Sequence, residues 1–309
     1  MSVFYDTIAP EFAGCVAALG NFDGVHAGHR AVISQTVAFA RTLNARPAAA
    51  VFSPHPRRVF QPDAPAFSLM NNAQRDRALL ASGAEAVFHI RFDKALATMT
   101  PEAFIKTVLV DQLKLKGVVT GSDFCFGKDR AGNAETLRTL GEKFGLSATT
   151  ATQIRHEGGD HKISSSDIRA ALRDGRVEDA SRLMGRPFAI AGEVTKGDQR
   201  GRTIGFPTAN VYLGDFIRPA LGVYATISTL SDGRRFNGVA NLGKRPTVDG
   251  KDERLEVHLF DFDGDIYGQV LETELIAFIR AEQKFESFEA LKRQIAADSD
   301  TARSLLEAR

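Results

Sequence analysis

Two histidines, His26 and His29, have the type and spacing to bind phosphate groups. They lie in the segment 20–30, GNFDGVHAGHR, which follows an apolar, strand-like run and opens an amphipathic, helix-like stretch. On a first helical turn, side chains three residues apart project to one face. The helix N-terminus adds free backbone amides and the positive end of its dipole. The pair could therefore bind phosphate oxygens and stabilise charge on a pyrophosphate leaving group.

The histidine segment does not match the common nucleotide-binding fingerprints, and two simpler roles compete with phosphate binding. The dinucleotide fingerprint G-x-G-x-x-G is absent from it, and the loop G-x-x-x-x-G-K-[ST] is absent from the whole chain. A zinc site would need a third ligand at the usual spacing, which this pair lacks. An isolated H-x-G-H is also common as a structural turn. Gly28 favours the phosphate hypothesis, because it lets a triphosphate approach the backbone.

A second candidate site lies in the segment 197–210, GDQRGRTIGFPTAN. Gly197 and Gly201 would let the backbone come close to a ligand. Thr208 and Asn210 alternate along a strand-like run, so both side chains are expected on one face. A hydroxyl and an amide oxygen are hard ligands suited to Mg²⁺, which takes its other ligands from water and phosphates. The alternative is an ordinary strand start, where threonine and asparagine are frequent.

A glutamate and a histidine alternate with apolar residues on another strand-like run. Glu256 alternates with the apolar Leu255 and Val257, so it is expected on the opposite face from them. By itself, a strand glutamate is usually just exposed to solvent. His258 shares the face of Glu256 and could be a structural histidine with satisfied hydrogen bonds.

The first half of the chain alternates apolar runs with amphipathic stretches. The strand-like runs are Cys15–Leu19, Ala48–Phe52, Ala86–Ile90, Gly117–Gly121 and Ala148–Ala151. The helix-like stretches are Val32–Leu43, Ala73–Ser82, Pro101–Leu113 and Ala134–Phe144. Continuous apolar strands that alternate with helices predict a doubly wound α/β domain with a parallel sheet. Such sheets bind ligands beyond the carboxyl ends of their strands.

The second half predicts a different architecture. From Phe188 onward, six short runs are separated by turn signals such as KGDQRG, LSDGRR, VDGKDE and DFDGD. This spacing indicates a six-stranded antiparallel β-barrel. A terminal helix is expected after Ser287, with Phe288, Leu291 and Ile295 on one face. Two short helices over 164–184 precede Gly185-Arg186-Pro187, so we place the domain boundary between residues 184 and 185.

Composition restricts the class of protein. The chain has 309 residues, more than one core usually holds, so domains over 1–184 and 185–309 are expected. A net charge of +1 disfavours nucleic acid and anionic membranes as partners. Two distant cysteines exclude a disulfide framework and suit a reducing cytoplasm. Neither a signal peptide nor an apolar run of spanning length is present. Oligomeric state cannot be predicted from the sequence.

Four ordered segments carry a family resemblance. They are GNFDGVHAGHR at 20–30, FSPHPRRVF at 52–60, GSDFCFGKDRAGN at 121–133 and ISSSDIR at 163–169. The first resembles the nucleotidyltransferase superfamily, and the set resembles the prokaryotic bifunctional riboflavin kinase/FAD synthetases. The resemblance extends over nearly the whole chain. It implies that the N-terminal domain transfers adenylyl from ATP to FMN, giving FAD and pyrophosphate.

The resemblance implies roles for N-terminal residues. Nucleotide and phosphate binding falls to Gly20, Asn21, Phe22, Asp23, Gly28, His29, Ser164, Ser165, Ser166 and Arg169. The serines precede a helix, and plain N-capping is the alternative for them. The flavin would meet His55, Pro56, Arg57, Asp123, Phe124 and Phe126. The alternatives are a rigid loop around Pro56 and ordinary core packing for the phenylalanines.

The resemblance also implies roles in the C-terminal domain. The segment 197–210 matches the riboflavin kinase signature, so Thr208 and Asn210 would hold Mg²⁺ and ATP. Glu256 falls at the catalytic base of the family, and Arg280 falls at a flavin-side position. A surface arginine is the alternative for Arg280. Riboflavin and MgATP would give FMN here, which then serves as substrate of the N-terminal site.

Two positions depart from the family pattern. Cys125 stands where a basic residue is usual, which puts one substrate contact in doubt, and we expect a buried, inert thiol there. Ser166 replaces the usual threonine but keeps its hydroxyl. The competing hypotheses are a nucleotidyltransferase with a single activity and a flavin-binding regulator without catalysis. The presence of His26, His29 and Glu256 argues against the regulator.

Overall fold

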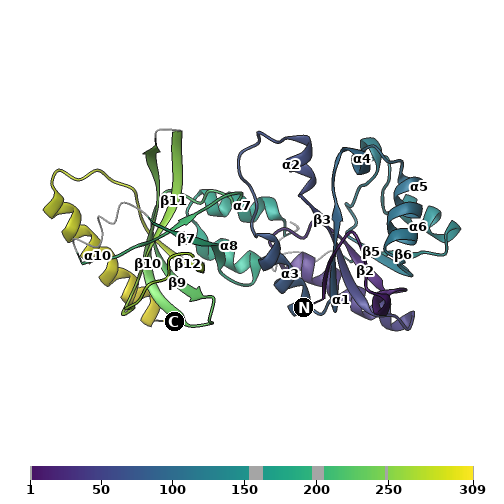
Figure 1. The fold of residues 1–309 in the computed structure, drawn as a ribbon, viewed down its shortest axis with the longest axis horizontal. Helices are drawn as coiled ribbons and strands as arrows, with labels where there is room; N and C mark the ends of the chain where they lie inside the picture. The colour runs from purple at the N-terminus through teal and green to yellow at the C-terminus, as the bar shows by residue number, and fades with distance from the viewer. Residues whose placement is uncertain (1, 153–162, 197–204, 248–249, 309) are drawn as a thin grey trace. The chain divides into compact units, whose positions relative to one another are not determined.

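The structure is a computed structural model that describes residues 2–152, 163–196, 205–247 and 250–308. It forms two compact units (Figure 1). The first contains Met1–Pro65 and Asn72–Ser164, and the second contains Ala66–Asn71 and Ser165–Arg309. In the described part of the chain, no helix is long and apolar enough to cross a bilayer.

A parallel sheet forms the first unit. Its strands are β1 (Val3–Tyr5), β2 (Val16–Gly20), β3 (Pro47–Ser53), β4 (Ala86–Arg91), β5 (Gly117–Thr120) and β6 (Ser147–Thr150). They lie in the order β1-β4-β3-β2-β5-β6, and every neighbouring pair is parallel. All five strand-like runs are confirmed as strands. The edge strand β1 was not predicted, because three residues are too few to show a pattern.

Helices connect these strands. They are α1 (Ala27–Thr42), α2 (Pro56–Phe60), α3 (Asn72–Ala81), α4 (Lys94–Ala97), α5 (Pro101–Ala103) with the π-helical η2 (Phe104–Gln112), and α6 (Ala134–Lys143). The strand order runs one way from β2 through β3 to β4 and the other way from β5 to β6. Right-handed crossovers therefore place α1 and α3 on one face and α6 on the other, as Figure 1 shows.

The reversal of strand order fixes where a ligand can bind. The chain moves in opposite directions from β2 and β5, which are neighbours in the sheet. In doubly wound sheets, ligands bind beyond the carboxyl ends of the strands at this switch point. The segments that begin at Gly20 and Gly121 leave the sheet there, and the segment after Ser53 leaves the adjacent strand β3.

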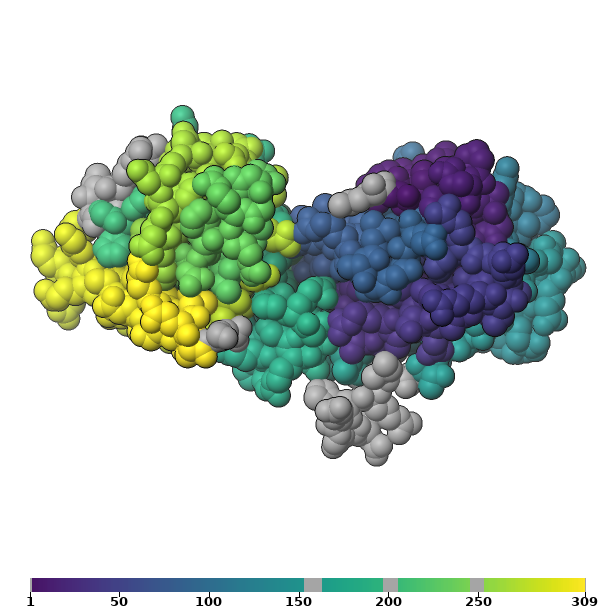
Figure 2. Space-filling view, turned by 90° about the horizontal axis from the view of Figure 1, so that it is seen from below, coloured from purple at the N-terminus to yellow at the C-terminus, as the bar shows by residue number. Residues whose placement is uncertain are grey.

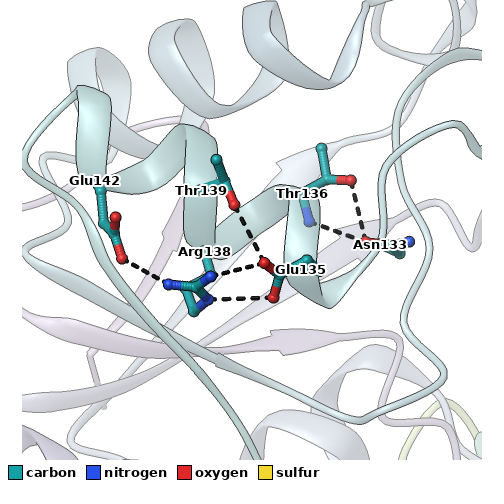
Figure 3. A network of polar contacts seen from close by, with 6 residues as sticks. All are labelled: Asn133, Glu135, Thr136, Arg138, Thr139 and Glu142. Atoms are coloured by element: carbon teal, nitrogen blue, oxygen red, sulfur yellow. Dashed lines mark hydrogen bonds and ion pairs between the residues drawn. The ribbon is translucent and has the colours of Figure 1, made fainter.

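Helix α6 has a polar network on its outer side (Figure 3). The Asn133 side chain caps the helix by accepting a hydrogen bond from the Thr136 amide at 2.9 Å. Arg138 forms ion pairs with Glu135 at 2.7 Å and Glu142 at 3.0 Å. These three side chains are more than half exposed, so their pairs contribute little to stability.

A closed antiparallel barrel forms the second unit. Its strands are β7 (Phe188–Thr195), β8 (Ala209–Tyr212), β9 (Gly222–Leu230), β10 (Arg235–Thr247), β11 (Gly250–Leu259) and β12 (Val270–Ala281). They close in the order β10-β11-β8-β7-β12-β9. The predicted six-stranded barrel is therefore confirmed. Leu255 and Val257 belong to its apolar core, as their alternation with Glu256 indicated.

In the described part of the second unit, three helices accompany the barrel. Helices α7 (Ser165–Arg173) and α8 (Val177–Met184) confirm the predicted helix pair, and both contribute apolar side chains to the barrel core. Helix α10 (Phe288–Glu307) packs against β9, β10 and β12, and Figure 2 shows it in yellow against the green strands. Ser287 caps α10 as expected. Phe288, at the first turn of α10, is 55% exposed, whereas Ala302 and Leu306 in the later turns pack in the core.

Candidate functional site

The loop after β2 brings the two histidines together at the start of α1. His26 occupies the N-cap position, and His29 lies in the first turn. Their rings stack with centroids 3.7 Å apart, and the Phe22 ring meets His29 edge-on at 5.3 Å. The His26 side chain makes no capping hydrogen bond, so the first amides of α1 remain suited to an anion. His26 and His29 therefore lie on the same face at the start of α1, as the sequence predicted.

Unusual backbone angles shape this loop. Phe22 and Val25 have positive φ angles of 52° and 36°. Such angles are uncommon for residues other than glycine, and for a β-branched valine they indicate a constrained backbone. The Arg30 guanidinium donates a hydrogen bond to the Val25 carbonyl at 3.0 Å, which helps to hold this shape.

Gly28 gives room to a neighbouring side chain as well as to a ligand. A Cβ atom at this position would lie 3.1 Å from Cε1 and 3.2 Å from Nδ1 of His26. It would also lie 3.7 Å from the carbonyl oxygen of Ile163. The chain just before Ser164 therefore runs beside the H-x-G-H turn, although the two segments are far apart in the sequence.

The segment after β3 forms a short capped helix. His55 is the N-cap of α2, and its Nδ1 accepts a hydrogen bond from the Arg57 amide at 3.1 Å. The neutral His55 ring therefore carries its proton on Nε2. Pro56 occupies the first helical position, where its missing N–H costs nothing. This local capping fits the structural alternative and is also compatible with substrate contacts.

The segment after β5 divides into core and surface. Phe126 is 5% exposed and packs against Phe104 and Phe124, with ring centroids 5.5 and 5.7 Å away. Core packing thus accounts for Phe126. Phe124 is half-buried and Asp123 is exposed, so these two can still meet a ligand.

The two cysteines lie in different environments. Cys15 is buried in the core, and burial raises the pKa of its thiol to about 12. It therefore stays protonated and inert near neutral pH. Cys125 was expected to be buried, but it is partly exposed and its Sγ lies 3.7 Å from the Asp123 carbonyl oxygen. The correction follows from the loop, which points Phe126 rather than Cys125 into the core.

The serine segment lies at the junction of the two units. Ser164 ends the first unit, whereas Ser165, Ser166 and Arg169 belong to the second, in α7. Within that unit, Arg169 donates a hydrogen bond to the Phe67 carbonyl at 2.8 Å, and its guanidinium lies over the Phe67 ring. Part of the Arg169 side chain therefore has a structural task that the sequence pattern did not reveal.

The barrel places the predicted kinase residues side by side. Asn210 of β8 lies directly opposite Glu256 of β11, which in turn lies opposite Asn241 of β10. Directly opposed residues of antiparallel strands have Cβ atoms about 4.5–5.5 Å apart on the same face. Amide, carboxylate and amide thus form a continuous polar row across three strands. Asn241 was not among the predicted site residues, because its position beside Glu256 depends on the strand register.

The environment of Asn210 fits a cation. Asn210 is 4% exposed, and its Oδ1 has no hydrogen-bond partner among the described residues. A buried amide oxygen without a partner is costly unless a ligand satisfies it. Thr208 lies just before β8 rather than within it. Gly197 and Gly201 lie outside the described residues.

The last predicted site residue is part of an ion pair. Arg280 on β12 makes a two-point ion pair with Asp298 of α10, with Nε–Oδ1 and Nη2–Oδ2 distances of 2.9 and 2.7 Å. Asp298 also accepts a hydrogen bond from Gln294 at 2.9 Å. Arg280 is therefore not a free surface arginine, and α10 fixes its position.

The fold and these residues together describe a class of two-domain protein: an α/β domain with a stacked histidine pair at its switch point, joined to a β-barrel with a row of polar side chains. Two family models match the same division of the chain, FAD synthetase over residues 8–167 and riboflavin kinase over residues 184–306. The chain belongs to the family of bifunctional riboflavin kinase/FMN adenylyltransferases. It is an enzyme with riboflavin kinase and FAD synthetase activities.

Individual relatives agree with this assignment. The bifunctional riboflavin kinase/FMN adenylyltransferase of Escherichia coli strain K12 is 43% identical over 96% of this chain and 93% of its own length. The Bacillus subtilis enzyme of the same name is 37% identical over 96% and 93%. A solved structure named as a macrolide-efflux protein from Streptococcus pneumoniae is 32% identical, with a TM-score of 0.84, over 98% of this chain and 99% of that one.

Proposed function

We propose that residues 185–309 phosphorylate the primary hydroxyl of riboflavin with MgATP. We further propose that residues 1–184 transfer adenylyl from a second MgATP to FMN, with release of pyrophosphate. We expect this enzyme of flavin-cofactor synthesis to work in the cytoplasm. Its substrates and products would be riboflavin, FMN, FAD, ATP and pyrophosphate. The ranges matched by the two family models support this division of labour.

In the kinase site, Thr208 and Asn210 would hold Mg²⁺. Their hydroxyl and amide oxygens are ligands that this ion prefers. The assignment is supported by Asn210 Oδ1, which lacks a hydrogen-bond partner within the part of the chain that the structure describes. When bound, the ion would neutralise phosphate charge. Glu256 would accept a hydrogen bond from the riboflavin hydroxyl and then its proton. Arg280, fixed by Asp298, would face the flavin.

In the adenylylation site, the chain would supply electrostatic stabilisation rather than a nucleophile. The FMN phosphate is itself the attacking group, so the protein must position it and stabilise the departing pyrophosphate. His26 and His29 would bind the phosphates together with the amides of α1 and the loop 20–23. Ser164, Ser165, Ser166 and Arg169 would add further phosphate contacts. The flavin would meet the loop of His55, Pro56 and Arg57 and the side chains of Asp123 and Phe124, with Phe126 supporting from the core.

The opposition of Asn210 and Glu256 across β8 and β11 is the observation that carries the kinase proposal. Glu256→Ala should lower the rate of FMN formation by about 10²–10⁴-fold, the usual contribution of a general base. His29→Ala should instead lower FAD formation from supplied FMN by about 10²–10³-fold. Chromatographic separation of FMN and FAD measures both rates.

A matched control is available on the same barrel. Glu193 is an exposed glutamate of β7, and Glu193→Ala should leave both rates unchanged. If Glu256→Ala and His29→Ala each removed both activities from folded protein, two separate sites would be ruled out. If the wild-type chain formed only one of the two products, it would have a single activity.

A further inference from the structure

Besides Cys15, three ionisable side chains are buried in the described part of the first unit, and the site above does not use them. Arg75 and Asp76 on α3 are 6% and 5% exposed, and His89 on β4 is 1% exposed. Burying such groups is costly unless each is paired, and a buried pair is weak evidence for a gain in stability. Their presence in an otherwise apolar α/β core calls for a different explanation.

The contacts of Arg75 lead to two of the candidate loops. Its Nη1 lies 3.3 Å from the carbonyl oxygen of Asn21 and 3.5 Å from that of Phe52. Asn21 follows β2 and begins the histidine loop, whereas Phe52 lies at the end of β3, just before the loop of His55. One guanidinium therefore reaches backbone oxygens of both segments. Nη2 donates a hydrogen bond to Asn72 Oδ1 at 3.1 Å. Asn72 lies on the same helix, α3, and so helps to orient the guanidinium.

Carboxylates near Arg75 favour its charged form. His89 Nε2 lies 3.0 Å from both carboxylate oxygens of Asp76, and the Tyr5 ring stacks on His89 at 4.4 Å. Burial lowers the pKa of Arg75, while the carboxylates of Asp76 and Asp23 raise it. An arginine resists deprotonation, so the group stays a cation with its donors in a fixed planar fork.

We propose that Arg75 is a positioning residue for adenylyl transfer. It fixes the histidine loop relative to the loop of His55, and thereby the ATP phosphates relative to the FMN phosphate. This inference rests on the adenylylation site proposed above. A displacement of about 1 Å between two reacting groups can cost about 10²-fold in rate, so a single bridge between the loops can matter for catalysis.

The test compares Arg75→Met and Arg75→Lys with the wild-type chain. Steady-state FMN adenylylation is measured at several temperatures below the unfolding transition of each variant, with the folded fraction followed by circular dichroism. Arg75→Met should lower kcat by about 10²-fold. The KM values for FMN and ATP should change by less than about threefold, because a positioning residue acts on the step after binding. Arg75→Lys keeps the charge but not the fork, and should lose about tenfold.

Two internal controls accompany these variants. Riboflavin phosphorylation by the same molecules should stay at the wild-type rate. Arg138→Met removes an exposed arginine with two carboxylate partners and should change neither activity (Figure 3).

Three results would overturn the inference. They are an unchanged kcat in folded Arg75→Met, a loss that only follows the unfolded fraction, and a loss that lies in KM alone. If Arg75→Met does not fold, Arg75→Lys decides by the same criteria. Absence of FAD formation by the wild-type chain would instead reject the proposed function.

Discussion

His258 shows how one side chain can connect two parts of the kinase site. Its Nδ1 lies 2.8 Å from the Pro207 carbonyl oxygen. Because a carbonyl oxygen can only accept, Nδ1 carries a hydrogen and donates the hydrogen bond. Its ring meets the rings of Phe206 and Phe260 edge-on at 5.3 and 5.8 Å. The strand that bears Glu256 thus holds the backbone directly before Thr208. The hydrogen bond to Pro207 therefore satisfies His258 structurally and, in the proposed kinase site, would also position Thr208.

Replacing His258 should therefore affect the kinase activity alone. His258→Phe keeps the aromatic packing but removes the donor, and should lower kcat/KM for riboflavin phosphorylation by about fivefold, since one hydrogen bond contributes about 1 kcal/mol. More Mg²⁺ should be needed for half-maximal rate, because Thr208 is less well placed. His258→Asn, which retains a donor, should recover part of the loss. An unchanged Mg²⁺ requirement in His258→Phe would contradict this role.

Residue types reveal candidate groups, whereas their neighbours depend on the register of distant strands. Asn210 could be named because its amide alternates with Thr208 along a strand-like run, whereas Glu256 was named from the family resemblance. The position of Asn241 beside Glu256 could not be predicted, since it depends on the pairing of β10 with β11. Arg75 and Asp76 were hidden for another reason: in the sequence QRDR they resemble the solvated face of a helix, yet both are buried.

At the scale of elements, strong hydrophobic periodicity was sufficient to predict a strand or helix, whereas weak periodicity was not. The buried strands β2 to β5 and the helices α1, α3 and α6 follow continuous apolar runs and amphipathic stretches. Short pieces such as β1 and α4 carry too few residues for a period. The π-helical η2 within the predicted stretch 101–113 was also missed, because the stretch is amphipathic in either helix type.

The barrel requires a glycine at position 222, where β9 begins next to β12. Its φ is 154°, and a Cβ there would lie 2.2 Å from the Arg280 carbonyl oxygen. Gly222→Ala should lower the free energy of unfolding by about 3 kcal/mol, because strand β12 must move. Gly233 is the matched control, with φ of 87° and no atom within 4 Å. Gly233→Ala should cost about 1–2 kcal/mol, the strain of a left-handed alanine.

Urea unfolding followed by circular dichroism measures the difference in unfolding free energy between the two variants. Because the two substitutions share the same change in side chain and a positive φ, the excess loss in Gly222→Ala reports the close contacts with Phe278, Arg280 and Ala281 of β12. Equal losses in the two variants would show that the approach of β9 to β12 does not restrict this position.

At the scale of the whole molecule, the compact units and the sequence pattern divide the chain at different points. The change of pattern lies at Gly185, whereas the second unit already begins at Ser165 and also takes in Ala66–Asn71. The reason is physical: α7 and α8 are amphipathic, and their apolar faces join the barrel core. An amphipathic helix can cover either domain, so the sequence could not assign these two.

The central claim is that two separate sites act in sequence on one flavin, and a mixing experiment tests it most directly. His29→Ala and Glu256→Ala are incubated with riboflavin, ATP and Mg²⁺, first apart and then together. Alone, His29→Ala should accumulate FMN, and Glu256→Ala should form little of either product. Mixed, they should form FAD, because FMN released by one variant is adenylylated by the other. A mixture that forms no more FAD than the separate variants would contradict the claim.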